Sequence, residues 1–332
     1  MSTRKIAIFV LTWGCVLALW GFPQSELHAA LAPGDHTLTL EHQGRTRSCI
    51  AHVPPQARTG KALPVVLNFH GGGSHAAAQQ NYTRLDLLAD QEGFLAIYPN
   101  GAGLLKNRGL TWNAGNCCGY AQTHDIDDVG FVNALLADLA RRTPIDPTRV
   151  YATGLSNGAM MVYRLAVEAS DRIAAIAPVA GTMMMKAFTP SRPVSVLHIH
   201  SVDDPRAPYA GGLGQHQIEH ASVEQTLQRW ITFNGCAATP EVGKTLHWRK
   251  EAQHAEHTAT QYTYGACREG AEVVLWKLTG AGHVWPGGIQ DHFERALGSS
   301  TEVINANAEM WRFFSRFAKP HDESHGYFDE TR

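Results

Sequence analysis

The sequence has little charge, no strong bias of sign and no segment that resembles a linker. Charged residues make up 17% of its 332 residues, and the formal net charge is −2 at pH 7. Because no basic patch stands out, nucleic acid is not an expected partner. No stretch rich in proline and serine divides the chain, so one large domain is the simplest interpretation. Hydrophobic residues account for 44% of the chain, which is enough for a sizeable core.

Long hydrophobic runs are scarce, and the clearest one lies at the N-terminus. Residues 6–20 are apolar, Arg4 and Lys5 precede them, and small residues suited to cleavage follow at 27–30. The run is too short and too early for a permanent membrane span. The pattern predicts a secretory signal peptide over residues 1–30, and hence a secreted or periplasmic protein.

Cysteine is infrequent, and there is no paired C-x-x-C motif, which makes a zinc site a weak interpretation. An exported protein is expected to form disulfides instead. Cys236 and Cys267 flank one late segment and are the best candidate pair. Cys49 with Cys117 or Cys118 is the next candidate. Five cysteines remain after the signal segment, so at least one thiol should be left unpaired within the monomer.

The most informative motif is Gly-Leu-Ser-Asn-Gly at residues 154–158. It follows a short apolar run at 149–153 and precedes a segment with the pattern of a helix, 157–167. A G-x-S-x-G between a strand and a helix is typical of a nucleophile elbow. The turn is so tight that its flanking positions tolerate almost no side chain, hence the glycines. Ser156 is therefore the candidate nucleophile.

A second motif, His-Gly-Gly-Gly at residues 70–73, follows the apolar, β-branched run 63–69. A glycine loop after an early strand can turn backbone N–H groups toward one point and form an oxyanion hole. We expect donors from Gly71 and Gly72 and from the N–H of Asn157, the residue after the serine. Losing one such donor typically raises the barrier by about 3 kcal/mol. The alternative is a flexible glycine turn.

A candidate acid and a candidate base follow the serine along the chain. The run 194–200 predicts a strand that ends before Asp203 and Asp204, at the edge where open α/β sheets bind ligands. The run 272–278 predicts the last strand, and His283 follows it in a glycine-rich loop. In that position His283 could accept the serine proton while a carboxylate orients the imidazole. Spacing alone does not separate Asp203 from Asp204.

Taken in order, these motifs resemble the secreted polyhydroxybutyrate depolymerase and feruloyl esterase-like family of α/β-hydrolases. The resemblance covers roughly residues 37–317. The matching stretches are 70–73, 98–101, Trp112 with 117–119, 127–131, 154–158, Asp204-Pro205 with Pro208-Tyr209, and 282–288.

The resemblance implies that the carboxylate before the proline, Asp204, is the triad acid. It further implies a single catalytic domain, here 31–318, no cofactor, and ester substrates from plant phenolics or polyesters. The alternation of predicted strands and helices independently favours a mostly parallel sheet with helices on both faces. The polar segment 319–332 is expected to be a disordered tail, and the pattern at 299–302 predicts a capping box for the last helix.

Three aromatic residues are candidates for substrate binding, because they lie in loops that should converge near the serine: Trp112, Tyr209 and Trp285. They could stack on an aromatic acyl group or a sugar ring. The alternative is that they form the edge of the core.

The predicted function is a secreted serine carboxylic ester hydrolase that acts through an acyl-enzyme on feruloyl, acetyl or polyhydroxyalkanoate esters. The expected partner is a small-molecule or polymeric ester, with no stable membrane span. Two other classes stay open. One is a metallohydrolase that uses His198 and His200 with Asp203 or Asp204. The other is a non-catalytic carbohydrate-binding protein on a hydrolase scaffold.

Overall fold

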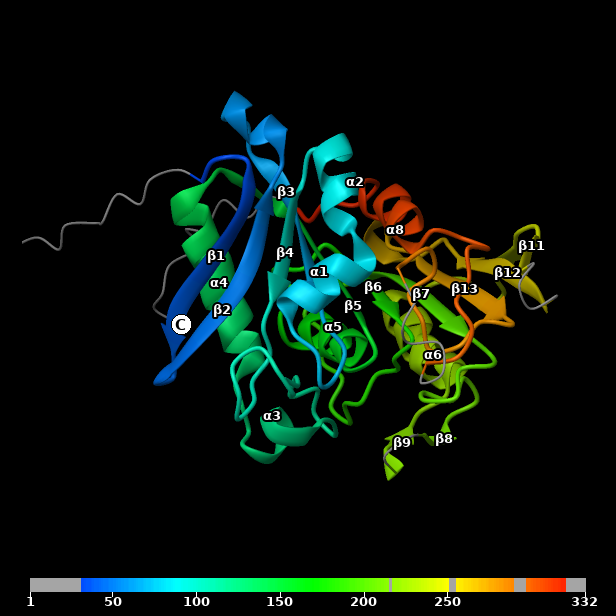
Figure 1. The fold of residues 1–332 in the computed structure, drawn as a ribbon. Coiled ribbons are helices and arrows are strands. Elements are labelled where there is room, and N and C mark those ends of the chain that lie inside the picture. Colours follow the sequence, from blue (N-terminus) through cyan, green and yellow to red (C-terminus); the bar gives the residue numbers. More distant parts are fainter. Residues whose placement is uncertain (1–30, 215–216, 251–254, 290–296, 321–332) are drawn as a thin grey trace, which may run out of the picture.

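A computed structural model describes residues 31–214, 217–250, 255–289 and 297–320 (Figure 1). The expected signal segment and residues 321–332 of the expected tail lie outside this part of the chain. Lys319, which was assigned to the tail, is buried. Its backbone N–H donates to Thr148 O at 2.8 Å, and its Nζ donates to Asp171 O at 2.6 Å. These bonds extend the ordered domain past the predicted boundary at residue 318.

The centre of the molecule is a run of parallel strands. In spatial order these are β4 (Leu95–Pro99), β3 (Leu63–Phe69), β5 (Ile145–Leu155), β6 (Ala175–Val179), β7 (Ser195–Ser201) and β13 (Val273–Thr279). Every residue of β3, β4, β6 and β7 is buried. A parallel strand covered on both faces needs apolar residues at successive positions, which explains the continuous runs in the sequence. The predicted mostly parallel sheet is confirmed.

Antiparallel strands extend this sheet at both sides to eleven strands within the described residues. The first side carries β1 (Gly34–His42) and β2 (Arg45–Val53), which pair with each other, and β2 pairs with β4. The other side carries β12 (Ala255–Tyr264), with β10 (Glu241–Val242) and β11 (Leu246–Lys250) paired to it. A small separate hairpin consists of β8 (Gly212–Leu213) and β9 (Glu219–His220).

Helices cover both faces of the sheet (Figure 1). One face packs against α4 (Asp128–Arg142), α5 (Asn157–Glu168) and α6 (Val223–Asn234), whose apolar side chains join one core cluster. The other face packs against α2 (Leu85–Glu92) and α8 (Ala306–Phe314), which share a second cluster. Shorter elements are α1 (Ala76–Thr83), α3 (Gly119–Thr123) and the 3-10 turns η1 (Pro55–Thr59) and η4 (Arg268–Gly270). The sheet is therefore the middle layer of three.

Side-chain caps open both α4 and α8. Asp127 caps α4 and accepts the N–H of Gly130 at 2.8 Å. The capping box predicted at 299–302 is wrong. Asn305 caps α8 instead, through Ala308 N at 3.0 Å. The Thr301 hydroxyl accepts Val303 N at 3.2 Å, and its carbonyl accepts Gly287 N at 2.9 Å, so this segment is tied to a neighbouring loop instead of opening a helix.

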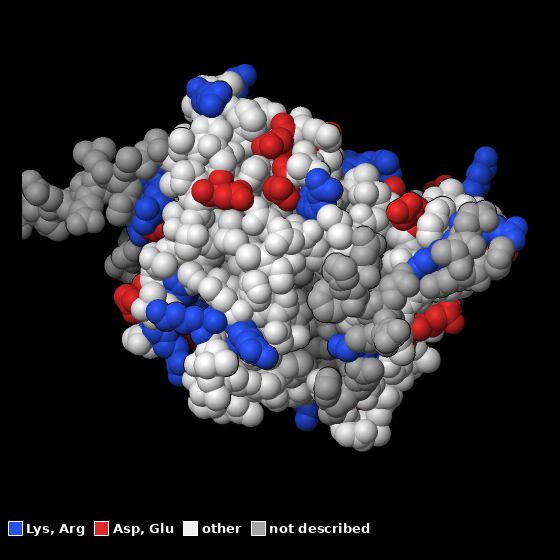
Figure 2. Space-filling model, in the orientation of Figure 1, with Lys and Arg blue, Asp and Glu red and all other residues white. Residues whose placement is uncertain are grey.

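Figure 2 shows basic and acidic side chains interspersed on one face of the molecule, with uncharged residues across its middle. No helix within the described residues has both the length and the apolar composition needed to cross a bilayer.

Candidate active site

Ser156 stands at the turn between β5 and α5, where the sequence predicted a nucleophile elbow. Its backbone has φ 59° and ψ −121°, a conformation that costs a residue with a Cβ energy and that is common at functional sites. The surrounding backbone leaves no room for side chains. A Cβ on Gly154 would lie 2.7 Å from Phe69 O, and one on Gly158 would lie 2.6 Å from His70 O. The glycines of the motif are therefore required by the close approach of β3 and the loop that follows it.

The loop after β3 lies directly against this turn. A Cβ on Gly71 would be 3.6 Å from the Cβ of Ser156, and one on Gly72 would be 3.5 Å from the Cβ of Asn157. The structure thus brings together the serine and the residues predicted to donate to an oxyanion. These distances are those of ordinary van der Waals contact, so the loop packs directly on the turn.

His70 fixes the start of this loop. Its ring is fully buried, and burial lowers its pKa to about 4, so the imidazole is neutral near pH 7. Gly101 N–H donates to Nε2 at 3.0 Å, and therefore the ring proton is on Nδ1, which donates to Gly71 O at 2.8 Å. The ring joins the loop after β3 to the loop after β4.

Asp204 and His283 meet at the same edge of the sheet, beyond the carboxyl ends of β7 and β13. His283 Nδ1 donates to Asp204 Oδ2 at 2.7 Å, and both side chains are buried. The other carboxylate oxygen accepts Arg206 N at 2.8 Å and Ala207 N at 2.9 Å. Burial alone would raise the pKa of Asp204, but hydrogen bonds from His200 and His283 and their charge interactions lower it below the ordinary range. The carboxyl group is therefore an anion near pH 7.

Asp203, the neighbour that the spacing could not exclude, faces elsewhere. Its Oδ2 accepts the N–H of Gly280 at 2.7 Å in an exposed position. The structure pairs His283 with Asp204 and gives Asp203 a contact with the loop after β13.

The three aromatic residues predicted to bind substrate differ from that expectation, because they lie in the interior. Trp112 is 0% exposed and Trp285 1%. The Trp285 indole N–H donates to Asn307 Oδ1 at 3.0 Å. Tyr209 is 7% exposed and lies edge-on to His200, with ring centroids 5.9 Å apart. Indoles this deep have no free face for a ligand, so the alternative in which they form the edge of the core describes them better.

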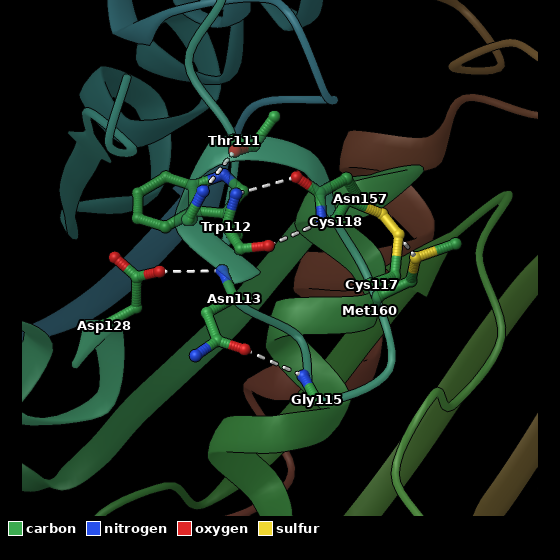
Figure 3. Close-up of a disulfide and its surroundings, with 10 residues drawn as sticks. Thr111, Trp112, Asn113, Gly115, Cys117, Cys118, Asp128, Asn157 and Met160 are labelled. Carbon is green, nitrogen blue, oxygen red and sulfur yellow. Dashed lines mark hydrogen bonds between the residues drawn. A yellow bond between two sulfur atoms is a disulfide. The ribbon is translucent and has the colours of Figure 1, made fainter. Parts of the chain in front are cut away.

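Trp112 is instead bonded to both halves of the candidate oxyanion site. Its indole N–H donates to His70 O at 3.0 Å. Its backbone N–H donates to Asn157 Oδ1 at 2.8 Å, and its carbonyl accepts Asn157 Nδ2 at 3.0 Å (Figure 3). The Asn157 side chain is thus fixed by a reciprocal pair of bonds to one residue.

The loop that carries Trp112 is fastened again on its far side. The buried carboxylate of Asp128 accepts Asn113 N at 2.8 Å (Figure 3) and Arg47 Nη2 at 2.6 Å. The Arg47 guanidinium also lies 4.0 Å above the Phe131 ring. Neither Asp128 nor Arg47 was among the predicted site residues. The signal that could have found Arg47 is that it is the one buried arginine of its strand, because an isolated buried charge requires a partner.

The cysteines pair partly as predicted. The Cys236–Cys267 disulfide is confirmed. The pairing of Cys49 with Cys117 or Cys118 is wrong, because Cys117 and Cys118 are joined to each other (Figure 3) and Cys49 is free and buried within β2. Cys118 N donates to Trp112 O at 3.1 Å, which places this disulfide at the base of the Trp112 loop. Burial is also the main reason that the pKa of the Cys49 thiol rises to about 12.

His198 and His200, considered above as metal ligands, have their ring nitrogens engaged in hydrogen bonds. His198 Nε2 and His200 Nδ1 are 3.1 Å apart, and His200 Nε2 donates to Ala207 O at 2.8 Å. Within the described ranges, no group of three or more histidine, cysteine, aspartate or glutamate side chains is arranged to hold a metal ion. The alternation on β7 places both rings in the core.

Comparison with known proteins agrees with this architecture. Residues 48–212 match the family described as Esterase PHB depolymerase. The bifunctional acetylxylan esterase/xylanase XynS20E of Neocallimastix patriciarum is 28% identical over 232 residues, and feruloyl esterase B of Piromyces equi is 26% identical over 246. These matches cover 70% and 71% of this chain but 30% and 42% of the relatives, so the chain spans less than half of their length.

A solved structure of a thermostable esterase aligns over 86% of this chain and 63% of its own, with a TM-score of 0.51 and 14% identity. At that identity the likeness concerns the fold, which is that of an α/β-hydrolase. The family and the relatives that this chain resembles are described as esterases, and the aligned structure is that of an esterase. The family match at residues 48–212 confirms the resemblance to polyhydroxybutyrate depolymerases and feruloyl esterases that was noted in the sequence.

Proposed function

We propose that this chain hydrolyses carboxylic esters with Ser156 as nucleophile, His283 as general base and Asp204 as the acid that orients it. The observation that carries the proposal is the buried 2.7 Å bond from His283 Nδ1 to Asp204 Oδ2, at the edge of the sheet where Ser156 stands on its strained turn. That bond places the proton of the neutral imidazole on Nδ1, and Nε2 is left with the lone pair that a base needs.

The proposed reaction has two halves. Ser156 Oγ attacks the ester carbonyl carbon while His283 Nε2 takes the hydroxyl proton, and the imidazolium returns that proton to the departing alcohol. The acyl group is then on Ser156. A water molecule, deprotonated by His283, attacks the acyl carbon and releases the acid, which regenerates the serine. The Asp204 anion favours the imidazolium in both halves.

We assign the oxyanion hole to the backbone N–H groups of Gly71, Gly72 and Asn157. Support comes from the packing of Gly71 and Gly72 against Ser156 and Asn157. Support also comes from the position of Asn157 as the first residue of α5, where the N–H groups are free of helix partners and the helix dipole favours negative charge. In this proposal Trp112 is a positioning residue for the hole and not a substrate contact.

For substrates we propose the ester types that the names of the family and its relatives indicate, namely feruloyl or acetyl esters of plant polysaccharides and polyhydroxyalkanoate esters. Export through the segment 1–30 would bring the enzyme to such substrates outside the cell. Purified protein should be compared on methyl ferulate, acetylated xylan and polyhydroxybutyrate film. Release of product from one of these and not from the others assigns the acyl group.

The serine mechanism is tested by Ser156→Ala. We expect the variant to lose hydrolysis of a p-nitrophenyl ester and covalent labelling by a fluorophosphonate, because both require the hydroxyl. Ser170→Ala is a matched control, since Ser170 is a buried serine bonded to Ser191 at 2.9 Å. It should retain both reactions. Turnover by a folded Ser156→Ala protein would exclude the mechanism.

A further inference from the structure

A line of buried polar side chains runs from α5 to the turn that carries Asp204. Tyr163 on α5 lies with its hydroxyl 2.8 Å from His198 Nδ1. His198 Nε2 is 3.1 Å from His200 Nδ1, and His200 Nε2 is 2.8 Å from Ala207 O. All three side chains are at most 1% exposed. Nothing in the proposed triad requires these residues, yet their hydrogen bonds are continuous.

With both imidazoles neutral, the last partner fixes the direction of every bond in this line. Ala207 O can only accept, so His200 Nε2 must carry a proton. In a neutral imidazole the other nitrogen is then an acceptor, so His200 Nδ1 accepts from a protonated His198 Nε2. His198 Nδ1 in turn accepts the Tyr163 hydroxyl proton. Burial lowers the pKa of His198 well below its ordinary value, in agreement with a neutral ring.

The line ends at the candidate acid. Ala207 is the residue whose N–H donates to Asp204 Oδ1, and His200 Nε2 also lies 3.4 Å from Asp204 Oδ2. Oδ2 is the atom that accepts from His283. His200 therefore contacts both the backbone of the Asp204 turn and the oxygen that faces the base. The other titratable ring close enough to influence Asp204 is His220 of β9, whose pKa burial lowers.

We propose that Tyr163, His198 and His200 form a positioning chain that, together with Ala207 O, keeps His200 protonated at Nε2 and thereby fixes the Asp204 carboxylate for His283. The chain joins the helix that begins behind the nucleophile to the turn that holds the acid. It rests on the proposed function, since it acts through the triad and touches no substrate. With the hydroxyl of Tyr163 removed, His198 Nδ1 loses its donor. That end of the chain then no longer opposes the opposite tautomer of the two imidazoles, in which a bare His200 Nε2 would face Ala207 O.

Tyr163→Phe tests this with little change of shape, and Tyr151→Phe is the matched control. Tyr151 is also fully buried, and its hydroxyl donates one 2.7 Å bond, to Phe317 O, away from the site. We expect both variants to lose a similar amount of thermal stability. Tyr163→Phe alone should lower kcat, by roughly three- to tenfold as one lost hydrogen bond allows, with KM unchanged. Equal kcat values for the two variants would overturn the proposal.

The nitrogen chemical shifts of ¹⁵N-labelled histidine report the tautomer of each imidazole. A purely structural role of these side chains in the core would not change them. In the unaltered protein we expect His198 and His200 both to be protonated at Nε2 and bare at Nδ1. Tyr163→Phe should produce the opposite tautomer in part of the population, and Tyr151→Phe should not. A His200 ring protonated at Nδ1 in the unaltered protein would contradict the direction of the chain.

Two replacements of His200 distinguish the contribution of its N–H donor from the contribution of its volume. Glutamine can place an amide N–H near the position of Nε2 and should keep most of the activity, whereas His200→Leu should lower kcat by about tenfold or more. Without that donor the Asp204 charge is less compensated and the His283 imidazolium is favoured. The acidic limb of kcat/KM should therefore move to higher pH in the leucine variant and not in the glutamine variant. An acidic limb of kcat/KM at the same pH in both variants would oppose the proposal.

If the leucine variant does not fold, the glutamine and Tyr163→Phe variants decide the question. Failure of the triad has a different signature. In that case Ser156→Ala would keep its turnover. If only the positioning chain is wrong, Ser156→Ala is inactive, and Tyr163→Phe and Tyr151→Phe have equal kcat values.

Discussion

The two sides of the candidate site are built by different physical means. On the side of the candidate nucleophile, backbone packs on backbone, and the positions of Ser156 and the loop after β3 follow from the absence of side chains at Gly154 and Gly158. On the acid side, side chains do the positioning, and Asp204 is surrounded by donors from two histidines and two peptide groups. Steric fit tolerates little change, whereas a hydrogen-bond network can lose one member and persist.

The largest effect should come from Gly158→Ala. The added Cβ would meet His70 O at 2.6 Å, and neither backbone can move without shifting the elbow or the oxyanion loop. We expect ester hydrolysis to be abolished and the free energy of unfolding to fall by about 3 kcal/mol. Chemical denaturation and a p-nitrophenyl ester assay measure the two losses.

Gly265→Ala is the control for this substitution, because a Cβ at Gly265 would meet nothing within 4 Å. It should keep activity and stability. A fully active Gly158→Ala enzyme would contradict the view that steric fit positions the nucleophile.

Asp204→Asn should have the next largest effect. The amide cannot replace the charge that favours the His283 imidazolium, and kcat should fall by about 10³-fold or more. Asp203→Asn is the matched neighbour, and its loss of one exposed contact with Gly280 should change kcat by less than about threefold. Comparable losses in both variants would mean that the two carboxylates share the role.

The same variant carries a pH signature in stability. The pKa of Asp204 is lowered in the folded state, so its charge stabilises the protein above the ordinary carboxyl pKa of about 3.9, and the contribution is lost as pH falls below that value. The melting temperature of the wild type should be higher than that of Asp204→Asn at pH 7. The difference between the two melting temperatures should become smaller toward pH 3. A gap that widens on acidification would contradict the assigned direction.

The smallest effect should come from Trp112→Phe, which removes the indole bond to His70 O and leaves the rest of the packing. As a positioning residue, Trp112 should affect all esters alike, with kcat down by roughly three- to tenfold for each. Parallel assays with methyl ferulate and p-nitrophenyl acetate measure kcat on an aromatic and a small acyl group. A loss confined to the aromatic acyl group would restore Trp112 as a substrate contact.

Sequence patterns predicted the nucleophile side more completely than the acid side. Glycines and buried strands leave a record in the chain, because only certain residues fit there, and 63–69 was predicted with the bounds that β3 has. Hydrogen-bond partners far apart in sequence leave no such record. Tyr163 and His198 are separated by 35 positions, and nothing in the sequence pairs them.

The same reasoning explains the other differences. Strand β12 lies at the flank of the sheet and is half-exposed, so its sequence mixes threonine, glutamine and tyrosine. For that reason no strand was predicted there. Trp112 and Trp285 were expected at a pocket because they lie in loops, but a loop residue can point inward when its indole N–H finds a partner, as both do here.

The solitary thiol of Cys49 gives the folded molecule a built-in reporter. It is the one free cysteine in the part of the chain that the structure describes, it is 1% exposed between neighbouring strands, and its thiolate form is suppressed. Alkylating reagents can therefore reach this sulfur only when the opening strands come away from the sheet. The rate at which Cys49 is alkylated thus measures how often that edge opens, with no engineered probe.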